Sequence, residues 1–236
     1  MSDMDHPTEL LKGSTEVRLY LLLVFRLVGW ASLSGRDREY FKKIKLQLKI
    51  TAMEKLKKRL TEVNKFLNET ELDALFPDLA KFFMGNYCIK GKDDKKYYIN
   101  EIEFYFFGKN YDDLRTSKKE STVTYPRNAD AGCWYIHDYG VDLTFNSDTE
   151  EKFGGGILIR SVEDNSGKVF DGPVKCVNEI WEEAVCAFEE TAPNPVIIPE
   201  KRIIELDEPT LRIAVGKDDS HKKLWRFTVK GKKVSK

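Results

Sequence analysis

The chain has 236 residues, of which 41% are hydrophobic and 12% aromatic, enough to build a substantial core. Its 39 basic and 39 acidic residues cancel to a net charge of zero, so the overall charge gives no sign of a polyanionic partner. The four cysteines form no CxxC pair and the three histidines are scattered, which argues against a zinc site.

The N-terminal region indicates no export signal. Its first residues are acidic and polar, so we expect a cytoplasmic protein, or a nuclear one in a eukaryote, with reduced thiols. Residues 16–33 are apolar but contain Arg26 and fall short of the roughly 20 apolar residues that span a bilayer. We interpret this stretch as a buried helix, with a transmembrane segment as the less favoured alternative, and expect no membrane partner.

Residues 41–67 have apolar positions three and four apart, which predicts a helix, and the polar turn at residues 34–39 is a plausible start for it. The apolar stripe consists of Leu46, Ile50, Met53, Leu56, Leu60, Val63 and Leu67. The other faces are rich in lysine, and Glu54 and Glu62 are the acidic residues between Phe41 and Phe66. Such a surface could lie along phosphates, although a lysine-rich helix face is more often simply solvated.

A short helix capped by Asn68 or Thr70 follows and ends near Gly85. Strand-like segments then dominate the chain, interrupted by one helix-like segment and one proline-rich loop. The strands are residues 86–90, 97–107, 133–139, 141–146, 155–163, 211–216 and 224–231, the helix is residues 176–190, and the loop contains Pro193, Pro195 and Pro199. Because strands and helices do not alternate regularly, an α+β fold with a mostly antiparallel sheet is favoured.

The strand YYINEIEFYFF, residues 97–107, has two glutamates two residues apart. Side chains alternate between the faces of a strand. One face therefore carries Glu101, Glu103 and Tyr105, and the other carries Tyr98, Ile102, Phe104 and Phe106. Glu103 is the best candidate for acid–base chemistry. The alternative is an exposed strand face with two solvated glutamates.

Several familiar nucleotide-binding and catalytic motifs are missing, among them GxGxxG, the P-loop and the GxSxG nucleophile elbow. Gly154, Gly155 and Gly156 precede a strand rather than a helix. We therefore expect these glycines to permit a bend or a close approach of two backbones.

A series of short segments follows one another between about residues 72 and 236. They are LFPDLAKFFMGNYCIKG (75–91), YINEIEFY (98–105), TYPRNADAG (124–132), WYIHDYGVDLTFN (134–146), GGGILIRSVED (154–164), DGPVK (171–175), and LRIAVG with KLWRFTVKG (211–231). In this order they resemble the alkyladenine (3-methyladenine) DNA glycosylase family, with its V-E-T-E-A-Y strand, T-P-R-N loop, Y-G-M hairpin, V-L-L-R-A-L-E-P strand and W-R-F-Y-V-x-G end. The resemblance implies an α+β domain of that family's type over residues 71–236, with a curved, mostly antiparallel sheet and flanking helices, preceded by a helical extension over residues 1–70.

Enzymes of that family flip a damaged base out of duplex DNA, because the glycosidic bond is inaccessible within the stack. The resemblance implies that Glu103 activates a water that attacks the sugar, a task that suits a carboxylate and requires no metal or cofactor. Tyr105 would stack on the flipped base, and Asn146 would lie on the floor of the pocket.

Two further positions would contact DNA on the same resemblance. Tyr139, beside Gly140, aligns with the wedge that fills the vacated stack, and Arg160 aligns with an arginine that holds phosphate near the scissile bond. Each residue also has a structural alternative. Tyr139 could be an ordinary hairpin aromatic, Arg160 could pair with a structural carboxylate, and Asn146 could be only a turn residue.

The sequence departs from the family pattern after Tyr105. The family has a pocket histidine a little beyond the strand tyrosine, whereas this chain has GKNYDDLRTS, with Leu114 near that position. His137 in the next hairpin is then a candidate for the pocket. The acidic residues Asp112, Asp113, Asp138 and Asp142 would repel phosphates if they lined the groove, and the terminal G-N-P is replaced by Gly231-Lys232-Lys233.

Three functions are consistent with these observations. The first is a monofunctional glycosylase that acts on damaged duplex DNA, since no lysine is placed for a Schiff-base step. The second is a non-enzymatic module on the same scaffold that binds nucleic acid or a nucleotide, with a single strand or a free nucleotide as possible ligands. The third is an interaction protein in which residues 16–70 bind a partner and the pocket is vestigial.

Overall fold

The computed structural model describes residues 35–111, 113, 124, 128–181, 194–213 and 223–232. The helix predicted at residues 16–33, and residues 182–190 of the helix predicted at residues 176–190, lie outside this part. The chain forms two units, Met1–Ile50 and Thr51–Lys236. The division into residues 1–70 and 71–236 stays a prediction.

The helix α3, Gly35–Glu62, begins within residues 34–39, its plausible start, and ends earlier than the predicted residue 67. A turn replaces its predicted end. The side chain of Asn64 accepts a hydrogen bond from the backbone N–H of Phe66 at 3.1 Å, and the backbone N–H of Leu67 donates to the carbonyl of Asn64 at 3.1 Å. Asparagine side chains favour such local bonds over a continued helix.

The apolar stripe predicted for this helix is buried only toward its C-terminal end. Leu56 and Leu60 are at most 2% exposed and belong to the core of the second unit, together with Val63 just after the helix. Leu46 is 59% exposed and Ile50 is 41% exposed. Periodicity locates the helix, but the stripe extends beyond the residues that have a core to face.

The helix α4, Glu69–Asn86, begins at Asn68, one of its two predicted caps. The side chain of Asn68 accepts from the backbone N–H of Glu71 at 3.1 Å, and the side chain of Glu71 accepts from the backbone N–H of Asn68 at 2.8 Å. This reciprocal pair is a capping box. The helix ends one residue after Gly85, close to the prediction, and packs against the first two strands of the sheet.

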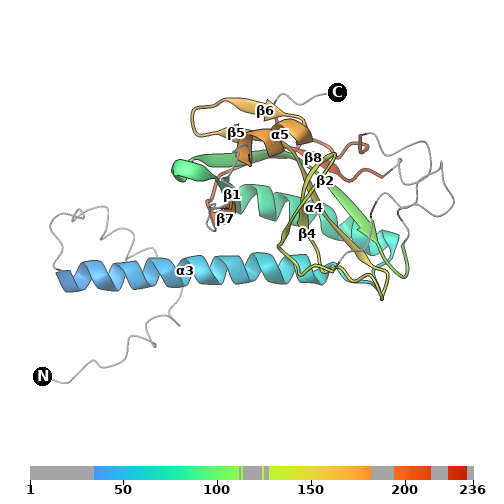
Figure 1. The fold of residues 1–236 in the computed structure, drawn as a ribbon, viewed down its shortest axis with the longest axis horizontal. Coiled ribbons are helices and arrows are strands. Elements are labelled where there is room, and N and C mark those ends of the chain that lie inside the picture. Colours follow the sequence, from blue (N-terminus) through green and yellow to red (C-terminus); the bar gives the residue numbers. More distant parts are fainter. Residues whose placement is uncertain are drawn as a thin grey trace, which may run out of the picture. The chain divides into compact units, whose positions relative to one another are not determined.

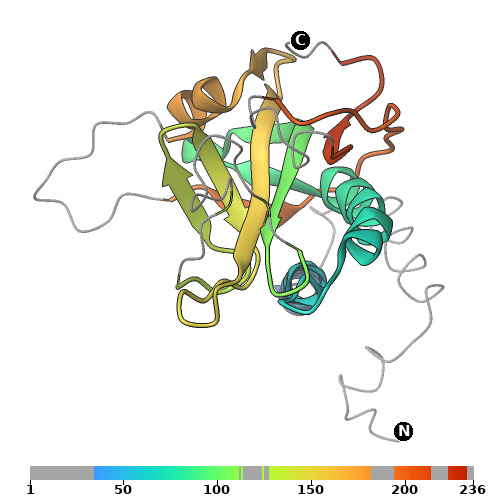
Figure 2. The same cartoon turned by 90° about the vertical axis from the view of Figure 1, so that its right-hand side faces the viewer.

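A curved antiparallel sheet forms the centre of the second unit (Figures 1 and 2). Its strands are β1 (Tyr87–Lys90), β2 (Lys96–Phe107), β3 (Trp134–His137), β4 (Gly140–Thr144), β5 (Gly154–Asp164), β6 (Val169–Asp171), β7 (Val196–Pro199) and β8 (Arg226–Thr228). The order is β3-β4-β5-β2-β1-β7, with β6 beside β5 and β8 beside β2. Every strand pairing is antiparallel, so the prediction of an α+β fold with an antiparallel sheet is confirmed.

Two short helical elements also lie within the described residues of the second unit. One is the 3-10 turn η2, Lys92–Asp94, between β1 and β2. The other is α5, Pro173–Ile180, which packs against β4, β5 and β6. It begins earlier than the predicted residue 176, because Pro173 fits the first turn of a helix, where its missing N–H is not needed.

Two C-terminal segments differ from the predictions. Residues 196–199, predicted within the proline-rich loop, form β7 and pair with β1 at the end of the strand order. An edge strand tolerates Pro199 because one side of its backbone makes no ladder hydrogen bonds. Leu211–Ile213 are not a strand, although the backbone of Thr210 just before them exchanges hydrogen bonds with that of Arg226.

The strand β2 is irregular in its middle, which corrects one predicted face. In its pairing with β5, Asn100 on β2 and Arg160 on β5 have no Cα partner. An extra residue reverses the alternation of side chains on either side of it. Tyr98, predicted on the core face, instead lies beneath the guanidinium of Arg202, 5.6 Å from the centre of its ring. The core face of β2 consists of Tyr97, Ile99, Ile102, Phe104 and Phe106.

The predicted close approach at the glycines is confirmed where β5 begins. A Cβ on Gly155 would lie 2.1 Å from the carbonyl oxygen of Tyr105 and 3.0 Å from the Cα of Phe106. Only glycine allows β5 to pass β2 at this distance. This contact sets how closely β5 packs beside β2, the strand that carries the two glutamates.

Candidate functional site

Glu101 and Glu103 lie on the face of β2 that is opposite the aromatic core, and both are buried. Glu101 is 1% exposed and Glu103 is 0% exposed. The interpretation of two solvated glutamates is therefore wrong. Burying a carboxylate is costly unless it is paired and hydrogen-bonded. Both side chains should therefore have specific partners.

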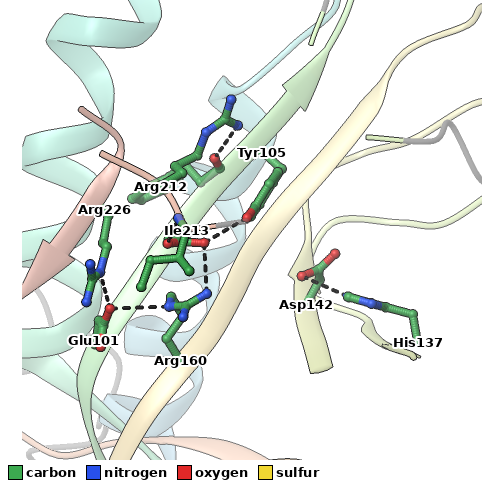
Figure 3. A network of polar contacts seen from close by, with 10 residues as sticks. Glu101, Tyr105, His137, Asp142, Arg160, Arg212, Ile213 and Arg226 are labelled. Carbon is green, nitrogen blue, oxygen red and sulfur yellow. Dashed lines mark hydrogen bonds and ion pairs between the residues drawn. The ribbon is translucent and has the colours of Figure 1, made fainter. Parts of the chain in front are cut away.

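Three donors among the described residues hold Glu103, and they come from Tyr105, Arg160 and Ile213, which Figure 3 labels. Its Oε2 accepts from the hydroxyl of Tyr105 at 2.7 Å and from Nη1 of Arg160 at 3.2 Å. Its Oε1 accepts from the backbone N–H of Ile213 at 2.8 Å. A carboxylate offers about four lone-pair sites. Within the part of the chain that the structure describes, three are filled and one acceptor position on Oε1 remains.

Glu101 is the second carboxylate of the site. Together with Glu103 and Arg160 it forms the carboxylate cluster. Its Oε1 accepts from Nε of Arg160 at 3.2 Å and from Nε of Arg226 on β8. Burial raises the pKa of Glu101, and the two arginines oppose this effect. Its Oε2 is buried and has no hydrogen-bond partner within the part of the chain that the structure describes.

Arg160 bridges the two carboxylates and is 7% exposed. It stands at the irregular position of β5, and bulges commonly redirect a side chain in this way. Of the two roles considered for Arg160, phosphate binding and pairing with a structural carboxylate, this geometry corresponds to the second. In this structure its guanidinium is directed to Glu101 and Glu103 rather than exposed to a phosphate.

A second buried ion pair lies beside this cluster. Arg212 donates to both carboxylate oxygens of Asp113 at 2.7 Å and to the carbonyl of Phe104 at 3.1 Å. Asp113 also accepts from the backbone N–H of Phe106 at 3.3 Å, and burial raises the pKa of its carboxyl against the effect of Arg212. The pair holds Arg212 against β2 and so places the adjacent backbone N–H on Glu103.

Asp113 lies in the segment GKNYDDLRTS, where this chain lacks the pocket histidine of the family that it resembles. Its carboxylate is 0% exposed and paired with Arg212, so it does not line an exposed groove. Leu114 and Asp112 lie outside the described residues. Asp113 therefore forms a buried ion pair with Arg212.

The hairpin of β3 and β4 carries the other predicted residues. Tyr139 is 65% exposed in its two-residue turn, and its backbone N–H donates to Nδ1 of His137 at 3.2 Å. Nε2 of His137 lies 3.5 Å from a carboxylate oxygen of Asp142. A Cβ on Gly140, which has φ of +145°, would come within 2.8 Å of Pro173, so this turn requires glycine.

The pair of His137 and Asp142 shares a face of the sheet with Glu103. Asp142 is directly opposite Leu158 on β5, and Leu158 is directly opposite Glu103 on β2. Residues directly opposite each other project from the same face. Two strand spacings separate Asp142 from Glu103, about 10 Å. Figure 3 shows the pair across β5 from the carboxylate cluster.

Asn146 serves a loop rather than the cluster. Its side-chain oxygen accepts from the backbone N–H of Ala131 at 2.9 Å and so ties the segment before β3 to the end of β4. This is the contact of a turn residue, as the structural alternative states. Of the predicted residues, the structure joins Glu103, Tyr105 and Arg160 in direct contact and places His137, Tyr139 and Gly140 on the hairpin.

Sequence reasoning missed Arg212 and Arg226 as members of the site. Both stand inside segments that were recognised, LRIAVG and LWRFTVKG. The arginine in each segment was the available signal. A single arginine in a strand-like segment does not show which carboxylate it pairs with, because Glu101 and Arg226 are 125 residues apart.

Within the described residues, no group of three or more histidine, cysteine, aspartate or glutamate side chains is arranged to hold a metal ion. Among the described helices, none combines the length and the apolar character that crossing a membrane requires. No protein-family model matches the chain, and a search of curated proteins finds no significant match.

Proposed function

We propose that this protein hydrolyses the N-glycosidic bond of a damaged purine flipped out of DNA, with Glu103 as the base that activates water. The observation that carries the proposal is the fixed geometry of Glu103. Tyr105, Arg160 and the backbone N–H of Ile213 orient its carboxylate and leave one acceptor position on Oε1. A water bound there would be held by a base whose orientation is set before substrate arrives.

The hairpin supports the same function. Tyr139 projects at the tip of the β3–β4 turn with 65% of its surface exposed, as a side chain that fills a gap in a base stack must do. His137, joined to Asp142, lies on the same face of the sheet as Glu103. A base leaving the stack at Tyr139 would pass this pair on its way to Glu103.

Arg160 has a different role in this proposal from the one that the resemblance implies. It acts as a positioning residue, because it donates to Glu103 and Glu101 together. Its charge also offsets the repulsion between two buried carboxylates. Contacts to phosphate must then come from other residues.

A second candidate function is nucleic-acid or nucleotide binding without catalysis. It is favoured by one observation, that Glu103 is 0% exposed in this structure. Base stacking needs only exposed aromatic rings. Tyr135 and Tyr139 are 41% and 65% exposed on the hairpin and could provide them.

Base release from a panel of duplexes with alkylated or deaminated purines separates the candidates. Wild-type protein should release at least one base, and Glu103→Gln should lower the rate by about 10²- to 10⁴-fold, the usual contribution of a positioned base. Glu101→Gln is the matched control, since it makes the same chemical change to the other carboxylate bound by Arg160. It should lose less activity, and melting curves of both variants report whether they fold.

Two results contradict the hydrolase. If wild-type protein binds duplex, single-stranded DNA or nucleotide but releases no base from the panel, the non-catalytic candidate replaces it. If the protein neither binds nor releases, both candidates fail and a role as an interaction protein is favoured. Equal loss in Glu101→Gln and Glu103→Gln, with both variants folded, would show that Glu103 has no special part in the chemistry.

A further inference from the structure

The helix α3 concentrates positive charge in a chain that is neutral overall. Its sequence contains ten basic and four acidic residues, a net charge of +6, whereas the whole chain has 39 of each sign. The side chains of Lys42, Lys43 and Lys49 are exposed and make no ion pair with another described residue. Local charge of this kind attracts a polyanion whatever the net charge of the protein.

Four of the ten basic residues of α3 form one stripe within the first unit. Arg38, Lys42, Lys45 and Lys49 follow one another at spacings of four, three and four residues, which puts them on one side of the helix. At 1.5 Å per residue the stripe is about 16 Å long. Duplex DNA presents one negative charge for about every 1.7 Å of its axis, so several phosphates fall within this length.

In the second unit, the hairpin of β3 and β4 carries the tyrosine proposed to enter the base stack. The residues of this hairpin and its flanks do not provide such cations. Residues 128–148 contain four aspartates and no lysine or arginine. Arg160 is buried between two glutamates. A protein that holds DNA for base flipping nevertheless needs contacts to the phosphate backbone, which supply most of the non-specific affinity.

The apolar residues of α3 argue against a membrane surface as the partner. Leu46 and Leu48 are 59% and 36% exposed, and residues two apart project from nearly opposite sides of a helix. A helix that lies in a bilayer interface has its apolar residues on one face and its charges on the other. The exposed Leu46 and Leu48 therefore do not lie together on one such apolar face.

We infer that the stripe of Arg38, Lys42, Lys45 and Lys49 binds the phosphate backbone of nucleic acid. The inference rests on the proposed function, because it identifies where the protein holds the DNA whose base it removes. The contact is independent of sequence and of damage, since lysine and arginine in the stripe read charge rather than base edges.

The test is the salt dependence of binding to an undamaged duplex. The triple variant Lys42→Gln, Lys45→Gln, Lys49→Gln removes three charges from the stripe. The matched control, Lys81→Gln, Lys168→Gln, Lys201→Gln, removes three exposed charges elsewhere. Each lost phosphate contact should reduce the slope of log K against log salt by about 0.9, so the stripe variant should lose about 2.7 and the control should keep the wild-type slope.

The full-length protein is used throughout, and vesicles that contain phosphatidylserine provide the second probe. Wild-type protein should bind the duplex more tightly than the vesicles. The inference is overturned if the stripe variant keeps the wild-type slope, if both triple variants lose slope equally, if wild-type protein does not bind duplex, or if it binds vesicles in preference to duplex.

Base release by the same variants separates this inference from the proposed function. If wild-type protein releases a base and the stripe variant binds DNA as wild type does, the inference about the stripe is wrong and the proposed hydrolase is supported. If wild-type protein releases no base but its duplex binding depends on the stripe, the proposed hydrolase is wrong and the inference about the stripe is supported. Glu103→Gln should bind undamaged duplex with the wild-type slope in either case.

Discussion

The hydroxyl of Tyr105 donates a hydrogen bond of 2.7 Å to Oε2 of Glu103, two residues earlier on the same strand. Side chains two apart on a strand share a face, so the donor is built in next to the acceptor. Arg160, from β5, donates to the same oxygen at 3.2 Å. The carboxylate is thus held by one partner from its own strand and one from the neighbouring strand.

Replacing Tyr105 by phenylalanine should destabilise the protein. The change removes one hydrogen bond to a buried carboxylate and leaves the ring in place. Hydrogen bonds to charged groups contribute about 1.5–3 kcal/mol, and we expect a loss of that size in urea unfolding. Tyr139→Phe makes the same chemical change on an exposed side chain and should stay within about 0.5 kcal/mol of wild type. Equal effects would show that the hydroxyl of Tyr105 contributes nothing specific.

Stability should fall in alkaline solution, in part because of Tyr105. Burial, and then the charge of Glu103, raise the pKa of its phenol well above the ordinary value. Above about pH 10 the unfolded chain releases this proton while the folded protein retains it. Unfolding is therefore favoured as pH rises through that range, by up to about 1.4 kcal/mol per pH unit for one proton. Below about pH 10 the contribution is constant.

Urea unfolding between pH 8 and 11 measures this effect. Tyr105→Phe should show a shallower alkaline fall than wild type, while Tyr139→Phe should follow the wild-type curve. The remaining fall comes from other groups, including Tyr87, whose pKa burial also raises. Parallel curves for wild type and Tyr105→Phe would contradict the prediction.

Breaking the buried pair of Asp113 and Arg212 should cost more than removing it whole. Asp113→Asn leaves a guanidinium that is 1% exposed without its carboxylate, and such changes cost about 3–5 kcal/mol. The double variant Asp113→Leu, Arg212→Met removes both charges. It should lose less than Asp113→Asn does, and less than the sum of Asp113→Leu and Arg212→Met measured separately, which a double-mutant cycle by urea unfolding would show. Additive losses would mean that the two side chains do not stabilise each other.

Alanine at Gly155 should be poorly tolerated because of the backbone of β2. The new Cβ would lie 2.1 Å from the carbonyl oxygen of Tyr105, so one strand would have to move. We expect a loss of more than about 3 kcal/mol in thermal or urea unfolding. Gly167→Ala is the control, since φ is +88° there but no atom lies within 4 Å of the added Cβ. It should lose about 1–2 kcal/mol from backbone strain alone.

Local patterns in the sequence were sufficient for most of the secondary structure. The cap at Asn68 depends on a residue three positions away, and the alternation in EIEFY, residues 101–105, depends on neighbours two positions away. Predictions failed where the cause was tertiary. The β7 strand needs β1 to pair with, and the exposure of Leu46 depends on how far the core extends along α3.

For the candidate site, the sequence by itself determined that Glu101, Glu103 and Tyr105 share one face of a strand, because alternation is a property of the local backbone. Only the tertiary structure decided that this face is buried and that Arg160 bridges the two glutamates. Glu101 and Arg160 are 59 residues apart in the chain, and their contact follows from the pairing of β2 with β5 at an irregular position. The cost of burying charge in a medium of low polarity then requires the pairing that the sequence alone could not specify.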